Sequence, residues 1–205
     1  MGRTRFKKSK VYGDGFGIID KQEHEAEGVV PLFLGKPIAE DDDDVVALAE
    51  VDENKEYTLA KTELDVPRAI VVERAQDTAD DTIGDLTVKG TDYYGDELEE
   101  EIAVGDHGVQ VYSKYAYKTI ESITGSTHTP SDTNQEDSIK IGSGAFIGLP
   151  IALEDADHVL CSLTGSTART AANIDAQVGD PPTVAESLVD VAPDTNEALV
   201  WIRMP

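Results

Sequence analysis

Histidine and cysteine side chains are the first candidates for chemistry in this sequence. The zinc-binding motif H-E-x-x-H, which places two histidines one helical turn apart, is absent. Cys161 is the only cysteine and lies in the apolar run 159–163, so we expect a small buried residue and neither a disulfide nor a cysteine metal cluster. The histidines are dispersed along the chain, at His24, His107, His128 and His158. This set therefore predicts no zinc hydrolase.

Serine and glycine motifs give no catalytic signature either. Residues 142–144 and 165–167 combine glycine with serine, but neither has the G-x-S-x-G spacing of a nucleophile elbow. The phosphate-binding pattern G-x-x-x-x-G-K-[ST] is absent, and the alternating glycines of residues 13–17 do not have the spacing of a dinucleotide-binding loop. The sequence predicts no bound cofactor.

Carboxylates are the most abundant reactive groups. Glu99 and Glu101 lie on one face of an expected strand, and such a pair could serve a glycosidase, which needs two carboxyl groups about 5 to 10 Å apart. The acidic run 40–44 could supply oxygen ligands to a divalent cation. With 41 acidic residues, however, pairs arise by chance, and consecutive residues rarely converge on one ion. We expect a solvated acidic loop at residues 40–44, no metal site and no enzyme activity.

The overall charge indicates the solvent in which the protein works. The chain has 41 acidic and 17 basic residues in 205, which gives a net charge of −24. Such a surface repels itself in dilute buffer and is tolerated when concentrated salt screens it. We therefore expect a halophilic source. The alternative is an acidic protein of an ordinary mesophile.

Basic residues are concentrated at the start of the sequence, where residues 1–10 contain no acid. A basic arm on an acidic body points to an acidic neighbour, and we predict partner contacts at Arg3, Arg5, Phe6, Lys7, Lys8 and Lys10. One such arm with a single aromatic residue is not the pattern expected for nucleic-acid binding. The alternative is a solvated tail. No apolar run is long enough to span a membrane, and no secretory signal is expected.

Alternation of apolar and polar residues with a period of two dominates residues 84–150. It predicts strands at 85–91, 97–104, 109–124 and 138–141, the last ending at a Gly-Ser-Gly break. In the second of these strands Leu98, Ile102 and Val104 share one face, and Glu97, Glu99 and Glu101 lie on the other. The pattern is typical of a hairpin with one buried and one wet, acidic side.

Further strands are predicted at 29–34, 45–51, 55–62, 69–73 and 198–204, and short helices at 170–177 and 184–189. Proline in the first of these strands favours an edge position, and Trp201 in the last is expected in the core or at a subunit contact. The predicted fold class is mainly β, with a β-sandwich or barrel-like domain, an extended N-terminal arm and few short helices. The predicted domains are a basic arm at 1–28, a small β-rich segment at 29–65 and a main β domain at 66–205.

Five short motifs follow one another between residues 64 and 153. They are Val-Pro-Arg at 66–68, G-T-D-x-x-G at 90–95, K-Y-A-Y-K-T-I-E-S-I at 114–123, Ile-Gly at 141–142 and Gly-Leu-Pro at 148–150. This succession resembles small β-rich virion structural proteins, including head-decoration-like ones, of tailed bacteriophages and haloarchaeal tailed viruses. The resemblance covers under half of the chain.

The resemblance implies a non-enzymatic virion protein, assembled in the host cytoplasm, which decorates, cements or forms a turret on the head shell. The implied partners are the major capsid protein or other virion subunits, with further copies of the chain in a trimer, pentamer or hexamer. Neither a membrane nor nucleic acid is an expected partner. The alternatives are a tail tube or baseplate subunit, and a module that recognises host glycans through residues 125–137.

Overall fold

The computed structural model describes residues 28–76, 82–129, 137–170 and 174–203, and strands are the dominant regular structure in these residues. The predicted mainly-β fold class is confirmed. A single 3-10 turn, η1 (Ala156–His158), is the helical element among the described residues. The strands are β1 (Val29–Gly35), β2 (Asp41–Glu50), β3 (Glu63–Gln76), β4 (Thr82–Ile83), β5 (Leu86–Thr91), β6 (Glu97–Ile102), β7 (Gln110–Tyr112), β8 (Tyr117–Gly125), β9 (His128–Thr129), β10 (Ser138–Gly148), β11 (Val159–Thr164), β12 (Thr167–Thr170), β13 (Ala176–Gln177), β14 (Leu188–Asp190) and β15 (Ala198–Arg203).

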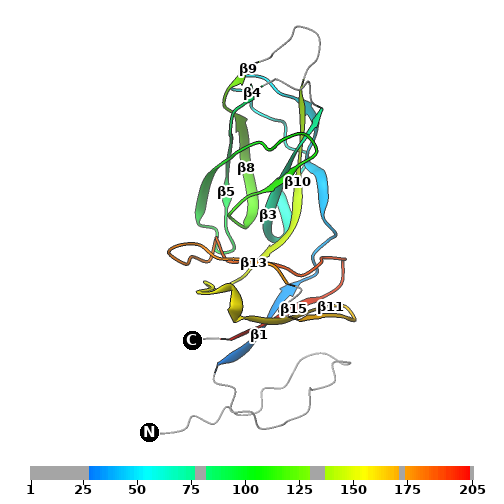
Figure 1. Ribbon diagram of the computed structural model, residues 1–205, viewed down its shortest axis with the longest axis vertical. Coiled ribbons are helices and arrows are strands. Elements are labelled where there is room, and N and C mark those ends of the chain that lie inside the picture. The colour runs from blue at the N-terminus through cyan, green and yellow to red at the C-terminus, as the bar shows by residue number, and fades with distance from the viewer. Residues whose placement is uncertain (1–27, 77–81, 130–136, 171–173, 204–205) are drawn as a thin grey trace.

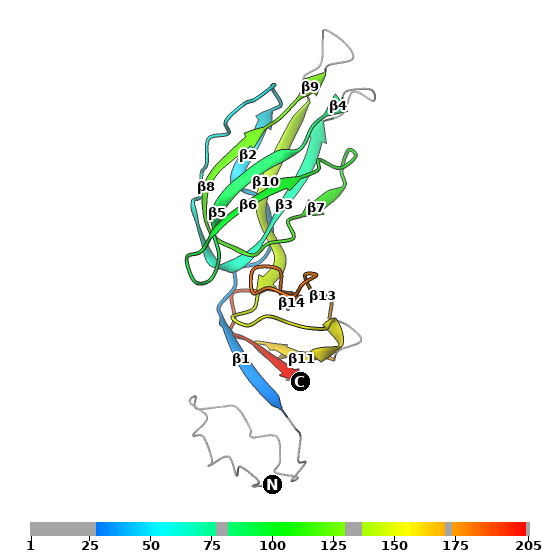
Figure 2. The same cartoon turned by 90° about the vertical axis from the view of Figure 1, so that its left-hand side faces the viewer.

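The described structure is elongated and has two main sheets (Figure 1). A nine-stranded antiparallel sheet has the order β13-β14-β10-β3-β8-β5-β6, with β2 added on β10 and β7 on β3, and it curls into a half-barrel. A four-stranded antiparallel sheet, β1-β15-β11-β12, forms the lower end in both views (Figures 1 and 2). The strands β4 and β9 pair separately at the opposite end.

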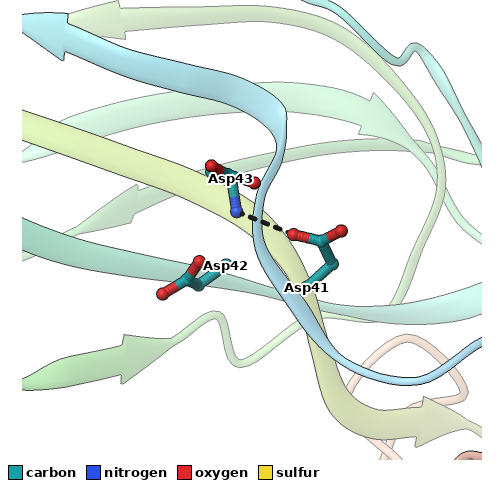
Figure 3. A group of neighbouring side chains, drawn as sticks. All are labelled: Asp41, Asp42 and Asp43. Atoms are coloured by element: carbon teal, nitrogen blue, oxygen red, sulfur yellow. Dashed lines mark hydrogen bonds between the residues drawn. The ribbon is translucent and has the colours of Figure 1, made fainter.

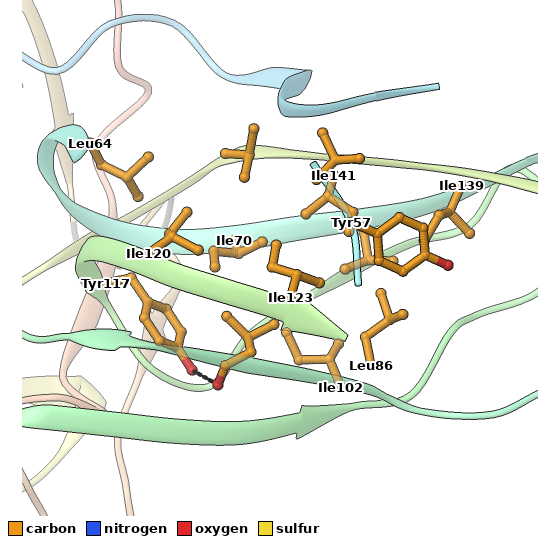
Figure 4. Packing of buried hydrophobic residues seen from close by; sticks show 14 of the residues in the cluster. Tyr57, Leu64, Ile70, Leu86, Ile102, Tyr117, Ile120, Ile123, Ile139 and Ile141 are labelled. Carbon is orange, nitrogen blue, oxygen red and sulfur yellow. Dashed lines mark hydrogen bonds between the residues drawn. The ribbon is translucent and has the colours of Figure 1, made fainter. Parts of the chain in front are cut away.

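The half-barrel encloses a core of β-branched, leucine and tyrosine side chains (Figure 4). Leu86 and Val88 of β5 are fully buried, as their alternation predicts, and the exposed residues of β6 are its glutamates at odd-numbered positions. The predicted hairpin with one dry and one acidic face is therefore confirmed. Burial raises the pKa of the Tyr57 phenol in this core to about 12.

The four-stranded sheet has a core of its own. Ala198, Val200 and Ile202 of β15 point inward, and they pack with residues of β14 and of the segment that follows β10. β10 runs through both cores, because Ile139 and Ile141 lie in the half-barrel core and Ile147 lies in the lower one. The two regions are thus built on a shared strand. The predicted domain boundaries after residues 28 and 65 stay predictions.

Arg68 of β3 joins the regions at their junction. Its side chain is fully buried, donates from Nε to the carbonyl oxygen of Gly144 at 2.8 Å and from Nη1 to that of Ile38 at 3.1 Å, and pairs with Asp65 at 3.2 Å. The other oxygen of Asp65 accepts the backbone N–H of Ile38 at 2.6 Å. The segment between β1 and β2 is therefore held to β3 and β10 by one buried ion pair.

Two loop predictions are wrong because β2 and β10 pair along most of their length. The acidic run at 40–44 enters β2, where Lys61 and Lys140 neutralise Asp44 and Asp42 at 2.6 and 2.5 Å. The predicted break at 142–144 lies inside β10. A Cβ atom at Gly142 would overlap the backbone of Asp41, so glycine is needed there for the close approach of the two strands and does not end a strand.

Other predicted elements also need correction. The helix predicted at 184–189 is a turn followed by β14, and the described ends of the helix predicted at 170–177 belong to β12 and β13. Residues 55–62 contain an isolated bridge at Glu56, and the predicted strand 109–124 is divided into β7 and β8. The prediction of an edge strand at 29–34 is confirmed, since β1 lies at the edge of its sheet. No helix among the described residues is long and apolar enough to cross a bilayer.

Candidate interaction surface

The four-stranded sheet has one face turned away from its core, here called the outer face. Because side chains alternate along a strand, the inward position of Val200 places Leu199 and Trp201 on the outer face. The registers of the four strands align these side chains in two rows that cross the sheet. The rows are Phe33, Leu199, Leu163 and Ala168 in one, and Pro31, Trp201, Cys161 and Thr170 in the other.

Most side chains in these rows are apolar, and several are open to solvent. Phe33 is 58% exposed and Val29, on the same side of β1, is 37% exposed. Trp201, Leu199 and Leu163 are half-buried, and none of the described apolar clusters includes them. A contiguous exposed apolar face is unusual on a monomer and marks a place where another surface packs. The outer face is the candidate interaction surface of this chain.

The charge of these strands differs from that of the rest of the chain. With 41 acidic residues in 205, strands of seven, six, four and six residues would contain about five acids at average composition. β1, β11, β12 and β15 contain none, and their charged residues are Arg169 and Arg203. In contrast β2 alone has five acids and β6 has four. Acidic residues are therefore excluded from the sheet that bears the exposed apolar face.

A surface hollow of about 470 Å³ opens at the edge of the outer face, between β1 and the turn joining β5 to β6. Its cation, Lys118, already donates to the carbonyl oxygen of Leu64 at 2.6 Å and pairs with Glu63 at 3.2 Å. Its walls are otherwise mainly apolar or aromatic, among them Phe33, Val66, Pro67, Tyr93 and Pro150. The hollow extends the apolar surface around the edge strand and has few polar groups that would select a small ligand.

The acidic start of β2 is the other cluster with possible chemistry (Figure 3). Asp41, Asp42 and Asp43 each offer an oxygen within 4.8 Å of the others, and the backbone N–H of Asp43 donates to Asp41 at 3.3 Å. The side-chain contact with Asp41 and repulsion by both neighbouring carboxylates raise the pKa of Asp43. From the sequence, the prediction for this run is a solvated loop, and the alternative is a site for a divalent cation. The geometry brings the carboxylates together, while Lys140 already holds one of them at 2.5 Å.

The predicted partner-binding residues Arg3, Arg5, Phe6, Lys7, Lys8 and Lys10 lie outside the described residues. The glutamates 99 and 101 lie on the exposed face of β6, apart from any described cavity. Cys161 is half-buried on the outer face instead of fully buried, and burial raises the pKa of its thiol. From the sequence, Trp201 is expected in the core or at a subunit contact. It lies half-buried on the outer face, outside the described apolar clusters, where it is accessible for a subunit contact.

Residues of the motif succession have structural roles in the fold. Asp92 accepts hydrogen bonds from the backbone N–H groups of Tyr94 and Asp96 at 2.7 and 3.0 Å, which closes the turn between β5 and β6. Gly95 completes that turn with a φ of +86°. Together with the buried Arg68 and the close approach at Gly142, these contacts give parts of three motifs a role in folding. Other motif residues, among them Val66, Pro67 and Pro150, line the hollow beside β1.

Sequence reasoning missed two features that the structure shows. Glu100 is 7% exposed and turned inward, and its position between Leu98 and Ile102 on the apolar phase of β6 could have revealed this. Burial raises its pKa, and hydrogen bonds from the N–H groups of Lys114 and Tyr115 oppose that rise. The outer face was missed because β1, the β11–β12 hairpin and β15 come from three segments that are distant in sequence. Their shared lack of acids was the available signal.

In comparisons with known proteins, no protein-family model, no curated protein and no solved structure matches this chain.

Proposed function

We propose that this chain is a non-enzymatic structural protein of a virion, which decorates, cements or forms a turret on the head of a tailed virus from a halophilic host. The observation that carries a binding role is the exposed apolar face on a sheet without acids, in a chain of net charge −24. Its assignment to a virion is supported by the motif succession of residues 64–153.

In the proposed mechanism the protein acts by holding subunits together. The basic residues of the N-terminal arm, at positions 3, 5, 7, 8 and 10, contact acidic surfaces of the major capsid protein or of another virion subunit. The β-sheet region supplies contacts between copies of the chain. Assembly takes place in the host cytoplasm in concentrated salt, where the Debye length of about 3 Å at 1 M lets acidic subunits approach each other.

The direct test is a cryo-EM map of intact particles, in molar salt, purified from cells that produce this chain. Density for the chain on the head surface is the expected result. Density confined to the tail would replace the decoration role with a tube or baseplate role. Particles that lack the chain altogether would overturn the virion assignment and return attention to a glycan-binding module.

The arm is tested by neutralising its charges. We expect the variant Arg3→Gln, Arg5→Gln, Lys7→Gln, Lys8→Gln and Lys10→Gln to lose binding to particles stripped of this chain, measured by co-sedimentation in molar salt. The control Lys36→Gln with Lys89→Gln removes positive charge from exposed, solvent-screened ion pairs and should bind normally. Equal binding by both variants would contradict the role of the arm.

A further inference from the structure

We propose that the outer face of the four-stranded sheet is a contact between two copies of this chain, packed face to face about a two-fold axis. This inference rests on the oligomeric structural role proposed above and names the surface that performs it. Its centre is the pair of half-buried side chains Leu199 and Trp201 of β15, with Phe33 at the edge of the sheet.

Charge is the first argument for a second copy as the occupant. Two chains of net charge −24 repel each other over most of their surfaces, and like charges brought together in an interface cost free energy. The four strands of the outer face have no acid, so two copies can meet there without adding to that repulsion. The charge on the face itself is Arg203, at the end of β15.

Shape is the second argument. Sheets that pack face to face interdigitate their side chains at a separation of about 10 Å, with the strands nearly aligned. The outer face presents two parallel rows of side chains that cross all four strands and are mostly apolar, with Thr170 as the polar end of one row. A two-fold axis brings identical patches together, so each row would pack against the apolar rows of the other copy. No complementary charge pattern is required of the partner.

The size of the face sets the strength of the contact. Four strands about 4.8 Å apart and six residues at about 3.4 Å each give a footprint of roughly 400 Å². A standard stable interface buries about 800 Å² on each partner. The outer face alone is therefore too small for an obligate dimer. We expect a reversible dimer, which strengthens when salt screens the acidic remainder of each chain and when particle assembly raises the local concentration.

Trp201 makes the face observable without a label, because it is the only tryptophan in the chain. In molar salt, dilution of the full chain should convert dimers to monomers in sedimentation velocity. Over the same concentration range, quenching of Trp201 fluorescence by acrylamide should increase. Transfer to about 0.1 M salt, where the Debye length reaches about 10 Å, should shift the equilibrium toward monomer at equal concentration.

A matched pair of substitutions tests the location of the contact. Phe33 on the outer face is 58% exposed and Leu48 on β2 is 59% exposed, so Phe33→Glu and Leu48→Glu each add one acid at an equally exposed strand position. We expect Phe33→Glu to weaken self-association about tenfold or more, and Leu48→Glu to leave it unchanged. Phe33→Lys should also weaken it, because the apolar contact is lost whatever the sign of the new charge.

Several results would overturn the inference. A dimer weakened by Leu48→Glu and not by Phe33→Glu would place the contact on the nine-stranded sheet. A monomer with quencher-protected Trp201 at every concentration would mean that the chain covers its own face. A monomer that binds stripped particles and loses that binding through Phe33→Glu would assign the face to a different subunit. Self-association is measured without particles, so a chain that stays monomeric would contradict this inference and leave the virion assignment untouched. Particles that lack the chain would contradict the virion assignment and leave a measured dimer untouched.

Discussion

The two main sheets of this protein both contain strands with alternating burial, but they differ in the residues on the face opposite the core. In the nine-stranded sheet β6 alternates buried residues with exposed glutamates, and the acids face water. In the four-stranded sheet β15 alternates buried residues with half-buried apolar ones, and neither face carries an acid. Alternation with a period of two therefore places one face in a core in both sheets. The second face differs, because it is exposed and acidic on β6 and mainly apolar on β15.

This contrast between the two sheets indicates how an interface can be recognised in an acidic protein. An exposed apolar residue alone says little, since folded proteins expose much apolar surface. A whole sheet without the residue type that makes up a fifth of the chain is more informative. Here the absence and the exposed apolar side chains coincide on one sheet, which is why the outer face and not the equally exposed Leu48 is the expected contact.

The largest expected effect comes from separating the two regions at their junction. Arg68→Ala removes buried hydrogen bonds to Gly144 and Ile38 and leaves Asp65 without its cation. We expect a loss of about 3 to 5 kcal/mol in unfolding free energy, measured by urea denaturation in molar salt. Fluorescence of Trp201, which reports on the four-stranded sheet, should also change at lower urea than circular dichroism of the whole chain.

The control for this prediction is Lys89→Ala. Lys89 pairs with Glu99 at 3.2 Å, and both side chains are at least half exposed. Removing this solvent-screened pair should cost no more than about 1 kcal/mol. If Arg68→Ala behaves like Lys89→Ala, or if its two spectroscopic transitions coincide, the buried ion pair does not couple the two sheets.

A smaller effect is expected from reducing the acidity of β2. Asp41→Asn with Asp43→Asn removes two of the three clustered carboxylates and keeps Asp42 paired with Lys140. Less repulsion should raise the urea midpoint in dilute buffer, and the difference from the natural chain should vanish in molar salt, which screens charges beyond about 3 Å. A gain that persists unchanged in molar salt would show that repulsion is not its cause.

The smallest effect is expected at Glu100, because its burial and its two backbone donors act on its charge in opposite directions. Its pKa is raised in the folded protein above the ordinary 4.5, so the folded state holds this proton more strongly than the unfolded chain. The stability contributed by Glu100 is therefore fully present below pH 4.5 and falls as the pH rises from 4.5 through the raised pKa of the folded protein. Relative to Glu100→Gln, the natural chain should lose stability from pH 4.5 upward.

Stability curves for this comparison are measured by urea denaturation at several pH values in molar salt. Glu99→Gln, on the exposed face of the same strand, removes an equal formal charge and serves as the control. Superimposable pH curves for the two variants would mean that burial of Glu100 has no effect on its titration in the folded protein.

Local pattern predicted those parts of the fold that depend on neighbouring residues. The alternation in β5 and β6 gave both the strands and their buried faces, and the proline of β1 indicated an edge. The errors lie where a distant strand decides the outcome. Aspartates 41 to 44 form a strand because β10 pairs with them and lysines 61 and 140 neutralise two of them. Nothing within the acidic run itself indicates those partners.

Side-chain types and their order along the chain suffice to predict a mainly β protein, a strongly acidic composition and the alternation that buries one face of a strand. These follow from side-chain type and from the two-residue period of extended backbone. Which strands become neighbours depends on long-range pairing, and that pairing creates the outer face. Phe33, Leu163 and Trp201 come from three distant segments, and only the antiparallel registers of β1, β15 and β11 bring them into one apolar surface.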